Sequence, residues 1–259
     1  MSQTIDRREW RRRSRRSFLA LGAAGVLGAL GLAWVYTRNQ VGQLPWPLRA
    51  AHNANGKLWQ TLYGRGRLGV DPPAPPRGTP YRVNGDIGLM EEFDPSTWRL
   101  AVSTPGSGRG SATLTMADLS RMPQTETTEL FKCIEGWSMP IAYSGVRFSD
   151  FILATGAGMR EGKPRDLSSA SLYPYVGLAT PDGEYYVSLD MESALHPKTL
   201  LATGINGVPL SDEHGAPLRL IVPVKYGIKS LKRIGRIFFA DQRPPDYWAE
   251  QGYDWYAGL

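Results

Sequence analysis

The sequence predicts a single α+β domain behind an N-terminal targeting segment. Short β-prone runs recur along the chain, and the helical patterns among them are short and do not alternate regularly with the strands, which argues against a βαβ fold. The 259 residues include 29 glycines and 20 prolines, so turns are frequent. About 225 residues follow the targeting segment, enough for one large core. We expect three parts: the targeting segment at 1–36, an extension with a proline-rich linker at 37–80, and the domain at 81–259.

The first 36 residues carry the marks of an export signal. Seven arginines lie between Arg7 and Arg16, and an uncharged run rich in Leu, Ala and Gly follows as far as Tyr36. Residues 14–19 read SRRSFL and look like a twin-arginine signal, because the paired arginines directly precede the apolar run. The alternative is a transmembrane anchor, since about 20 apolar residues can span a bilayer. We therefore expect export to the periplasm by the twin-arginine machinery, with the segment acting as an anchor if it is not cleaved.

Most of the net charge belongs to this segment. Its seven arginines stand against Asp6 and Glu9, a net charge of +5, so the +6 of the whole chain leaves about +1 for the remainder. No basic stripe with interleaved aromatic residues replaces the lost charge. Nucleic-acid binding is therefore not expected.

Residues 37–80 predict one helix and one linker. In residues 45–63, Leu48, Leu58, Trp59 and Leu62 give an incomplete apolar face, which predicts a short helix. Residues 71–76 read DPPAPP, which is too rich in proline for a helix or a central strand and predicts an extended linker.

The domain proper is expected to begin after this linker. Asn84-Gly85 predicts a turn, Thr115 is expected to cap a short helix over residues 116–121, and Ser149 is expected to cap another that runs to Thr155. Strands are predicted at 98–102, 127–130, 172–178, 184–189, 218–222 and 234–240, with a turn at 180–183.

The stretch around Cys133 organises the domain. This is the only cysteine, so no intramolecular disulfide can form. A β-prone approach precedes it, and Gly136, Pro140 and Gly145 follow, so we expect it to lie where a strand runs out into a loop. Free cysteine is often a small buried hydrophobe, but a lone thiol in an exported protein is a liability unless it is buried or bound to a metal.

A second informative region spans residues 214–232. It places Arg219, Lys225, Lys229 and Lys232 around a glycine-containing turn, where backbone N–H groups and cationic side chains can converge on a phosphate. The alternative is an edge strand that lysines protect from pairing with another chain.

Both regions resemble one family. Residues 133–138 read CIEGWS and resemble the molybdenum-binding segment of the sulfite oxidase family of molybdopterin enzymes, and residues 214–232 are similar to that family's pterin-binding segment. The resemblance spans roughly residues 81–252. It implies a mixed, β-rich sulfite-oxidase-type molybdopterin-binding domain. Because the chain ends soon after Tyr253, we expect no immunoglobulin-like dimerisation domain of the kind found in sulfite oxidases, and a monomer.

The resemblance implies a role for several residues, position by position. Cys133 would ligate molybdenum, which a soft thiolate suits. Arg219, Ser230 and Lys232 would hold the pterin and its phosphate, and Thr180 would be a further cofactor contact.

Three other residues complete the expected site. Asn84 resembles an early asparagine contact in the bacterial methionine-sulfoxide-reductase branch. His214 stands where an asparagine is common in that branch, and its imidazole can still donate one hydrogen bond. Glu135, two residues after Cys133, would point into the site as an acid or a water-holding group if the strand continued.

The resemblance implies two-electron oxygen-atom transfer with a Mo-molybdopterin cofactor. The sulfite-oxidising branch has an arginine shortly after its cysteine, whereas Glu135 lies there in this chain and would repel sulfite. We therefore expect reduction of an S-oxide or N-oxide such as methionine sulfoxide, with electrons from a membrane-bound haem partner. Sulfite oxidation is the alternative. A second alternative is an exported binding module without cofactor, because Ile87, Tyr143 and His214 depart from the family pattern.

Overall fold

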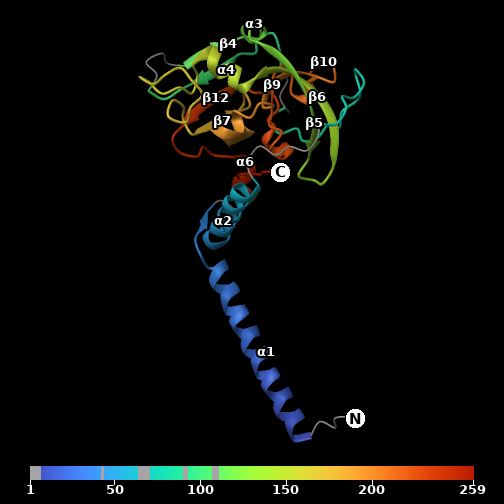
Figure 1. Ribbon diagram of the computed structural model, residues 1–259, viewed down its shortest axis with the longest axis vertical. Coiled ribbons are helices and arrows are strands. Elements are labelled where there is room, and N and C mark those ends of the chain that lie inside the picture. Colours follow the sequence, from blue (N-terminus) through green and yellow to red (C-terminus); the bar gives the residue numbers. More distant parts are fainter. Residues whose placement is uncertain (1–6, 42–43, 64–70, 90–92, 107–110) are drawn as a thin grey trace. The chain divides into compact units, whose positions relative to one another are not determined.

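The computed structural model describes residues 7–41, 44–63, 71–89, 93–106 and 111–259, and it divides into two compact units, Met1–Ala54 and Asn55–Leu259 (Figure 1). The first unit contains α1 (Arg7–Tyr36), β1 (Gln40–Val41), β2 (Leu44–Pro45) and the beginning of α2 (Trp46–Tyr63). The helix predicted at residues 45–63 is thus confirmed. Within α1, Trp10–Tyr36 is long and apolar enough to cross a membrane, judged by length and composition.

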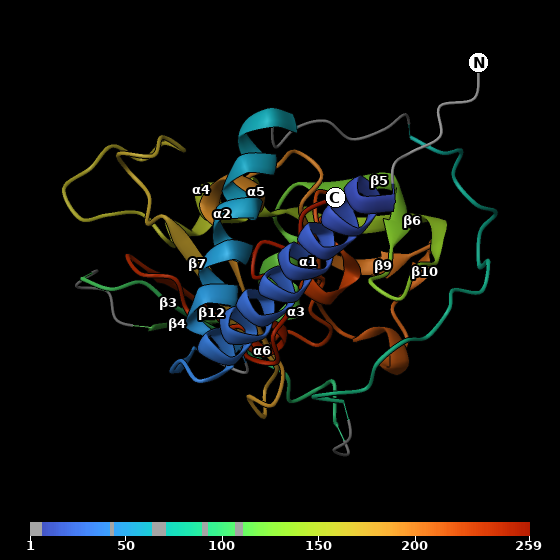
Figure 2. The same ribbon diagram turned by 90° about the horizontal axis from the view of Figure 1, so that it is seen from below.

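Two five-stranded sheets form the second unit in the part of the chain that is described. The first has the order β10-β9-β6-β5, with β11 paired to β9, and the second has the order β4-β3-β12-β7-β8. Figures 1 and 2 show β5, β6, β9 and β10 on one side of this unit and β3, β4, β7 and β12 on the other. The predicted α+β class is confirmed. The strands of the two sheets are β3 (Leu100–Ser103), β4 (Ser111–Leu114), β5 (Gln124–Lys132), β6 (Ser138–Arg147), β7 (Tyr175–Ala179), β8 (Tyr186–Asp190), β9 (Leu200–Ile205), β10 (Val208–Pro209), β11 (Arg219–Ile221) and β12 (Arg236–Ala240).

The long antiparallel hairpin of β5 and β6 carries Cys133 in its turn. As predicted, β5 runs out at Lys132, and the backbone N–H of Cys133 donates to the Trp137 carbonyl at 2.9 Å. The loop after Cys133 is shorter than Pro140 and Gly145 suggest, because β6 begins at Ser138 and contains both residues.

The positions of Pro140 and Gly145 explain why these two residues can lie in a strand. Pro140 pairs only with β5, since β9 joins β6 from Tyr143 onward, so no ladder hydrogen bond is lost on the other side. At Gly145 a Cβ atom would lie 2.2 Å from the Leu201 carbonyl oxygen, next to a shift of register. Glycine here permits a close strand crossing rather than a turn.

The second sheet contains the predicted hairpin of β7 and β8, with its turn at residues 180–183. Between this hairpin and β3, β12 pairs antiparallel to β7 and parallel to β3. The strands predicted at 98–102, 218–222 and 234–240 are confirmed in shorter form as β3, β11 and β12, whereas β4, β9 and β10 were not predicted.

Short helices connect the strands. Thr115 caps α3 (Met116–Ser120) in a reciprocal capping box with Asp118, as predicted. The expected cap at Ser149 is wrong: the N-cap of α4 (Phe148–Thr155) is Arg147, two residues earlier, and it makes no side-chain capping bond. The other short helices are α5 (Met191–Ala194), η1 (Asp212–His214), η2 (Gly227–Lys229) and α6 (Tyr247–Glu250).

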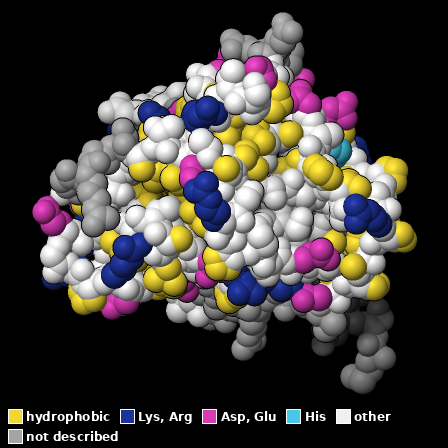
Figure 3. All heavy atoms as spheres, turned by 90° about the horizontal axis from the view of Figure 1, so that it is seen from above, with side chains coloured by type: hydrophobic (Ala, Val, Ile, Leu, Met, Phe, Trp, Pro, Cys, Tyr) yellow, Lys and Arg dark blue, Asp and Glu magenta, His cyan; other side chains and the backbone are white. Residues whose placement is uncertain are grey.

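The buried apolar side chains form two clusters. The larger one joins strands of the second sheet to α3 and α4, with Leu100, Phe148, Phe151 and Leu178 fully buried. The smaller cluster, around Ile141 and Tyr143 of β6, contains Cys133 and supports it from behind. On the face in Figure 3, Lys and Arg side chains are interspersed with Asp and Glu, as the small net charge of residues beyond the targeting segment predicts.

Candidate active site

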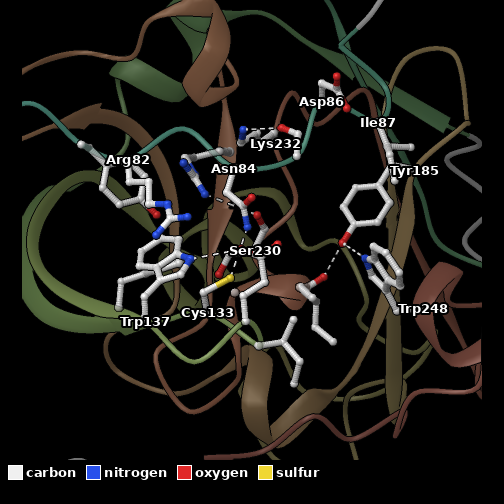
Figure 4. Close-up of a pocket in the computed structure, with 18 of the residues that line it drawn as sticks. Arg82, Asn84, Asp86, Ile87, Cys133, Trp137, Tyr185, Ser230, Lys232 and Trp248 are labelled. Carbon is white, nitrogen blue, oxygen red and sulfur yellow. Dashed lines mark hydrogen bonds between the residues drawn. The ribbon is translucent and has the colours of Figure 1, made fainter.

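A cavity of about 340 Å³ opens beside Cys133. Tyr81, Arg82 and residues 84–87 line it with the β5–β6 turn and the stretch from η2 to Lys232. Tyr185, Trp248 and Tyr253 complete the lining. Figure 4 shows Cys133 and Asn84 on one side of the cavity and Tyr185 with Trp248 on the other. The two regions singled out in the sequence therefore meet in one place.

Cys133 and Asn84 form the inner pair of the cavity. Cys133 is a free thiol with 6% of its surface exposed. The side-chain amide of Asn84 donates to its sulfur at 3.3 Å, and Figure 4 shows the two groups pointing toward each other. Asn84 precedes Gly85, whose φ of 70° lets the chain turn so that residues 84–87 line the cavity. A hydrogen bond of this kind stabilises negative charge on sulfur.

Arg219, Ser230 and Lys232 lie together in the lining of the cavity, and their expected binding of the pterin and its phosphate stays a prediction. Ser230 Oγ accepts from the Val222 N–H at 3.3 Å, and Lys232 Nζ donates to the Gly85 carbonyl at 2.7 Å. Arg219 is 2% exposed, and its Nε has no hydrogen-bond partner among the described residues. Burial, reinforced by the positive charge of Arg219, lowers the pKa of Lys232 to about 8. An anion placed here would pair with both cations and offset the cost of their burial.

Two expected contacts, Thr180 and His214, lie outside the cavity lining. The Thr180 hydroxyl donates to the Asp182 carboxylate in the β7–β8 turn. A Cβ added at Gly88 would lie 2.5 Å from its methyl carbon, so Thr180 supports the end of the 81–89 segment. The cofactor-contact role of Thr180 stays a prediction.

His214 contacts Tyr81, a residue of the cavity lining, from outside the cavity. Its Nε2 lies 3.3 Å from the Tyr81 carbonyl oxygen, its Nδ1 lies 2.6 Å from the Ser211 hydroxyl, and its ring lies 5.1 Å from the Tyr81 ring. Burial lowers the pKa of His214, which favours the neutral imidazole.

Glu135 lies at the rim. It lines the cavity but is exposed, and its carboxylate accepts from the Trp137 indole N–H at 3.3 Å. Arg82 covers the Trp137 ring at 5.0 Å, so the rim carries charges of both signs over an aromatic surface.

An aromatic wall that the sequence did not predict faces the thiol. Trp248 Nε1 donates to the Tyr185 hydroxyl at 3.0 Å, and that hydroxyl donates to the Ile228 carbonyl at 2.6 Å. Burial raises the pKa of Tyr185, so this phenol stays neutral. Trp248 and Tyr253 come from one segment and Tyr185 from another, and the density of Tyr and Trp in residues 247–256 was a sequence signal for the first two alone.

Comparison with known proteins identifies the family. The model of the oxidoreductase molybdopterin binding domain matches residues 87–248, more than half of the chain. The chain belongs to this family. The expected membership in the sulfite oxidase group of molybdopterin enzymes is thereby confirmed.

Several members of the family are similar in sequence. YedZ1 of Azospira oryzae, named as a subunit of a protein-methionine-sulfoxide reductase, is 36% identical over 69% of this chain and 63% of its own length. The catalytic subunits MsrP of Campylobacter jejuni and Ralstonia nicotianae are 33% and 35% identical over 67% and 64% of this chain, and over 60% and 51% of their own lengths. The sulfane dehydrogenase SoxCD of Paracoccus pantotrophus matches 59% of this chain and 40% of its own with a TM-score of 0.48 and 24% identity. The chain thus spans 51–63% of the length of the three curated relatives named above.

The donor groups of the cavity fit a molybdopterin. A buried thiol is a soft ligand for molybdenum, and one protein ligand suffices where the dithiolene of the pterin supplies the other sulfur atoms. Arg219 Nε, buried without a hydrogen-bond partner among the described residues, and Lys232 are donors suited to a pterin phosphate.

Proposed function

We propose that this chain is an exported oxidoreductase that removes the oxygen atom from an S-oxide or N-oxide, such as methionine sulfoxide, at a molybdopterin centre. The observation that carries the proposal is the pair at the inner end of the cavity, where the buried Cys133 sulfur accepts a hydrogen bond from Asn84 at 3.3 Å. The names of the similar MsrP proteins and of YedZ1 support the choice of substrate.

The proposal assigns a role to each residue of the candidate site. Cys133 would hold the metal, and the hydrogen bond from Asn84 would orient its sulfur. Arg219, Ser230 and Lys232 bind the pterin and its phosphate, and Thr180 and His214 fix the segments that carry these contacts. When bound, the molybdenum centre supplies the two-electron redox chemistry of oxygen-atom transfer.

The cavity lining favours an oxide without net charge. Tyr185, Trp248 and Tyr253 give the outer wall an aromatic surface that suits a thioether or sulfoxide sulfur. Glu135 at the rim repels a dianion such as sulfite and can hold the water that leaves. The overall reaction, R₂SO + 2e⁻ + 2H⁺ → R₂S + H₂O, therefore needs both an electron donor and a source of protons.

The electron donor is a separate protein in this proposal. The chain acts as a monomer in the periplasm after twin-arginine export and receives electrons from a membrane-bound haem partner. α1, which is apolar enough to cross a membrane, either serves as the signal or retains the chain at that membrane.

Metal analysis tests the cofactor. We expect about one molybdenum atom per chain in wild-type protein from a host that makes the cofactor, and loss of metal or of its redox response in Cys133→Ala. Leu130→Ala, at an exposed position near the end of β5, is the matched control and should retain the metal. Wild-type protein without molybdenum, from a host that loads a control molybdoenzyme, would exclude the proposal and leave a cofactor-free binding module.

Turnover tests the substrate. With reduced viologen as donor we expect reduction of methionine sulfoxide and dimethyl sulfoxide, and with ferricyanide as acceptor we expect no oxidation of sulfite. Sulfite oxidation without oxide reduction would establish the alternative activity, and full molybdenum occupancy without either reaction would remove both substrates.

A further inference from the structure

Asn206 lies outside the cavity lining, in the two-residue turn between β9 and β10, where Ile205 pairs with Val208. Its φ of 47° and the φ of 74° at Gly207 are typical of a type I′ turn, in which asparagine followed by glycine is favoured. The turn therefore explains the residue type. It does not explain why the side chain is buried, since only 2% of Asn206 is exposed.

On one side, Asn206 is bonded to the hairpin that carries Cys133. Its backbone N–H donates to the Ala142 carbonyl at 2.6 Å, and its side-chain Oδ1 accepts from the Ala142 N–H at 3.0 Å. Ala142 on β6 pairs with Thr128 on β5, and Cys133 lies five residues after Thr128. Asn206 thus fixes both backbone groups of one residue of this hairpin.

On the other side, Asn206 is bonded to the segment that carries Asn84. Its side-chain Nδ2 donates to the Thr79 carbonyl at 2.9 Å, and its backbone carbonyl accepts from the Gly78 N–H at 2.7 Å. Asn84 lies five residues after Thr79. Residues 78–84 belong to no helix or strand, so individual bonds of this kind, rather than a ladder, hold the segment in place.

Each polar group of Asn206 therefore has a partner, two on the hairpin and two on the segment. A buried amide that is bonded in this way fixes the two parts relative to each other. From the bonded residues, both parts run the same number of residues to the point where the Asn84 amide donates to the Cys133 sulfur at 3.3 Å. Displacement of one part against the other would weaken this bond, because a hydrogen bond depends steeply on its geometry.

Two other residues hold the segment closer to the cavity. His214 Nε2 lies 3.3 Å from the Tyr81 carbonyl oxygen, and Lys232 Nζ donates to the Gly85 carbonyl at 2.7 Å. Among the described residues, neither is hydrogen-bonded to β5, β6 or their turn. Asn206 is thus distinguished by its bonds to both parts.

The geometry points to Asn206 as the positioning residue that holds the Asn84 amide against the Cys133 sulfur. The inference rests on the proposed function, in which Cys133 would ligate molybdenum and a hydrogen bond to its sulfur would tune the metal. Asn206 acts through two segments and does not itself line the cavity. A change at Asn206 should therefore reach the metal only while the Asn84 amide is present.

Potentiometric titration of the molybdenum-loaded protein tests this dependence without turnover. Asn206→Gly tolerates the positive φ of the turn and loses both side-chain bonds, whereas Asn206→Asp keeps an acceptor for the Ala142 N–H but loses the donor to Thr79. We expect both variants to lower the midpoint potential by no more than Asn84→Ala does, and neither to lower it further in the Asn84→Ala background. Wild-type potentials in both variants, or an equal additional shift in that background, would overturn the inference.

Amide hydrogen exchange tests whether Asn206 holds the segment. Peptides that cover residues 78–88 should exchange about tenfold faster in Asn206→Gly, because one lost hydrogen bond changes a local opening equilibrium by about that factor. Thr155→Val is the matched control, since it removes a hydroxyl that donates to the Phe151 carbonyl at 2.7 Å and accepts from the Ala157 N–H at 3.1 Å, outside the cavity lining. It should change neither this exchange nor the potential.

The outcomes separate this inference from the proposed function. Unchanged exchange of residues 78–88 in Asn206→Gly, or the same acceleration in Thr155→Val, would overturn the positioning role and leave the proposed function intact. Wild-type protein that binds no molybdenum would overturn both.

Discussion

The Asn84 amide is the one side-chain donor to the Cys133 sulfur among the described residues, at 3.3 Å. A hydrogen bond to a ligating thiolate withdraws electron density from the metal and favours its reduced state. We expect Asn84→Ala to lower the midpoint potential of the bound centre by roughly 20–60 mV, the one-electron equivalent of a bond that contributes about 0.5–1.5 kcal/mol. Potentiometric titration measures this shift, and an unchanged or higher potential would contradict the role of Asn84.

The raised pKa of Glu129, which is buried on β5, predicts how the free energy of unfolding depends on pH. Its pKa rises from 4.5 in the unfolded chain to about 8 in the fold, so between these values the folded state binds more protons than the unfolded state. The free energy of unfolding contributed by this group therefore falls as pH rises through that window, by about 3 kcal/mol at pH 7. Glu129→Gln should flatten this dependence in denaturant unfolding at pH 5, 7 and 9. A parallel shift at every pH would mean that the mutation acts through packing alone.

At the scale of elements, the close crossing of β6 and β9 depends on Gly145. A Cβ there would lie 2.2 Å from the Leu201 carbonyl oxygen and 2.7 Å from the Ala202 Cα, both backbone atoms that cannot rotate away. We expect Gly145→Ala to reduce the free energy of unfolding by about 3 kcal/mol. Gly183→Ala, in the β7–β8 turn at φ 77° with open space around it, should cost about 1 kcal/mol. Equal losses in urea unfolding would show that the crossing adapts.

The elements that the sequence predicted are those with local causes. The capping box at Thr115, the end of β5 at Cys133 and the β7–β8 hairpin each depend on a few neighbouring residues. β6 was not predicted because Pro140 and Gly145 are typical of loops, and only the pairing with β5 and β9 explains them. Tertiary contacts here override local propensity.

In the site, too, residues with local sequence signals were predicted, and residues placed by tertiary contacts were not. Cys133, Asn84, Arg219, Ser230 and Lys232 were predicted and lie around one cavity. The aromatic wall was not predicted, because Tyr185 is far in sequence from Trp248 and Tyr253, and the fold alone brings them to one cavity. Glu129 had no sequence signal, since its burial depends on which face of β5 turns inward.

At the scale of the whole molecule, a buried ion pair ties the C-terminal segment to the cavity. Lys229 of η2 pairs with Asp246, which caps α6, and both side chains are almost fully buried. Asp246 also accepts from the Ser188 N–H at 2.9 Å on β8, so one carboxylate joins three parts of the chain. Gly227 and Ile228, beside Lys229, line the cavity. Asp246→Ala should therefore reduce the free energy of unfolding by about 3–5 kcal/mol and lower molybdenum content, because it leaves a buried charge unpaired.

A double variant of Lys229 and Asp246 separates the effect of their charges from that of their packing and hydrogen bonds. Lys229→Met with Asp246→Leu removes both charges and should recover part of the lost stability in denaturant unfolding. A double variant no more stable than Asp246→Ala would show that the hydrogen bonds of Asp246 to the backbone, rather than the charge of Lys229, dominate.

The targeting segment offers a test in which net charge stays constant. Arg15 and Arg16 directly precede the apolar run, whereas Arg11 and Arg12 lie one helical turn earlier in the same basic stretch. A twin-arginine signal is read by a receptor that distinguishes arginine from lysine, while a membrane anchor responds to positive charge alone. We expect Arg15→Lys/Arg16→Lys to retain the protein in the cytoplasm and Arg11→Lys/Arg12→Lys to leave export unchanged, as measured by cell fractionation and immunoblotting. Equal export of both variants would exclude the twin-arginine route, and α1 would then act as a charge-oriented anchor.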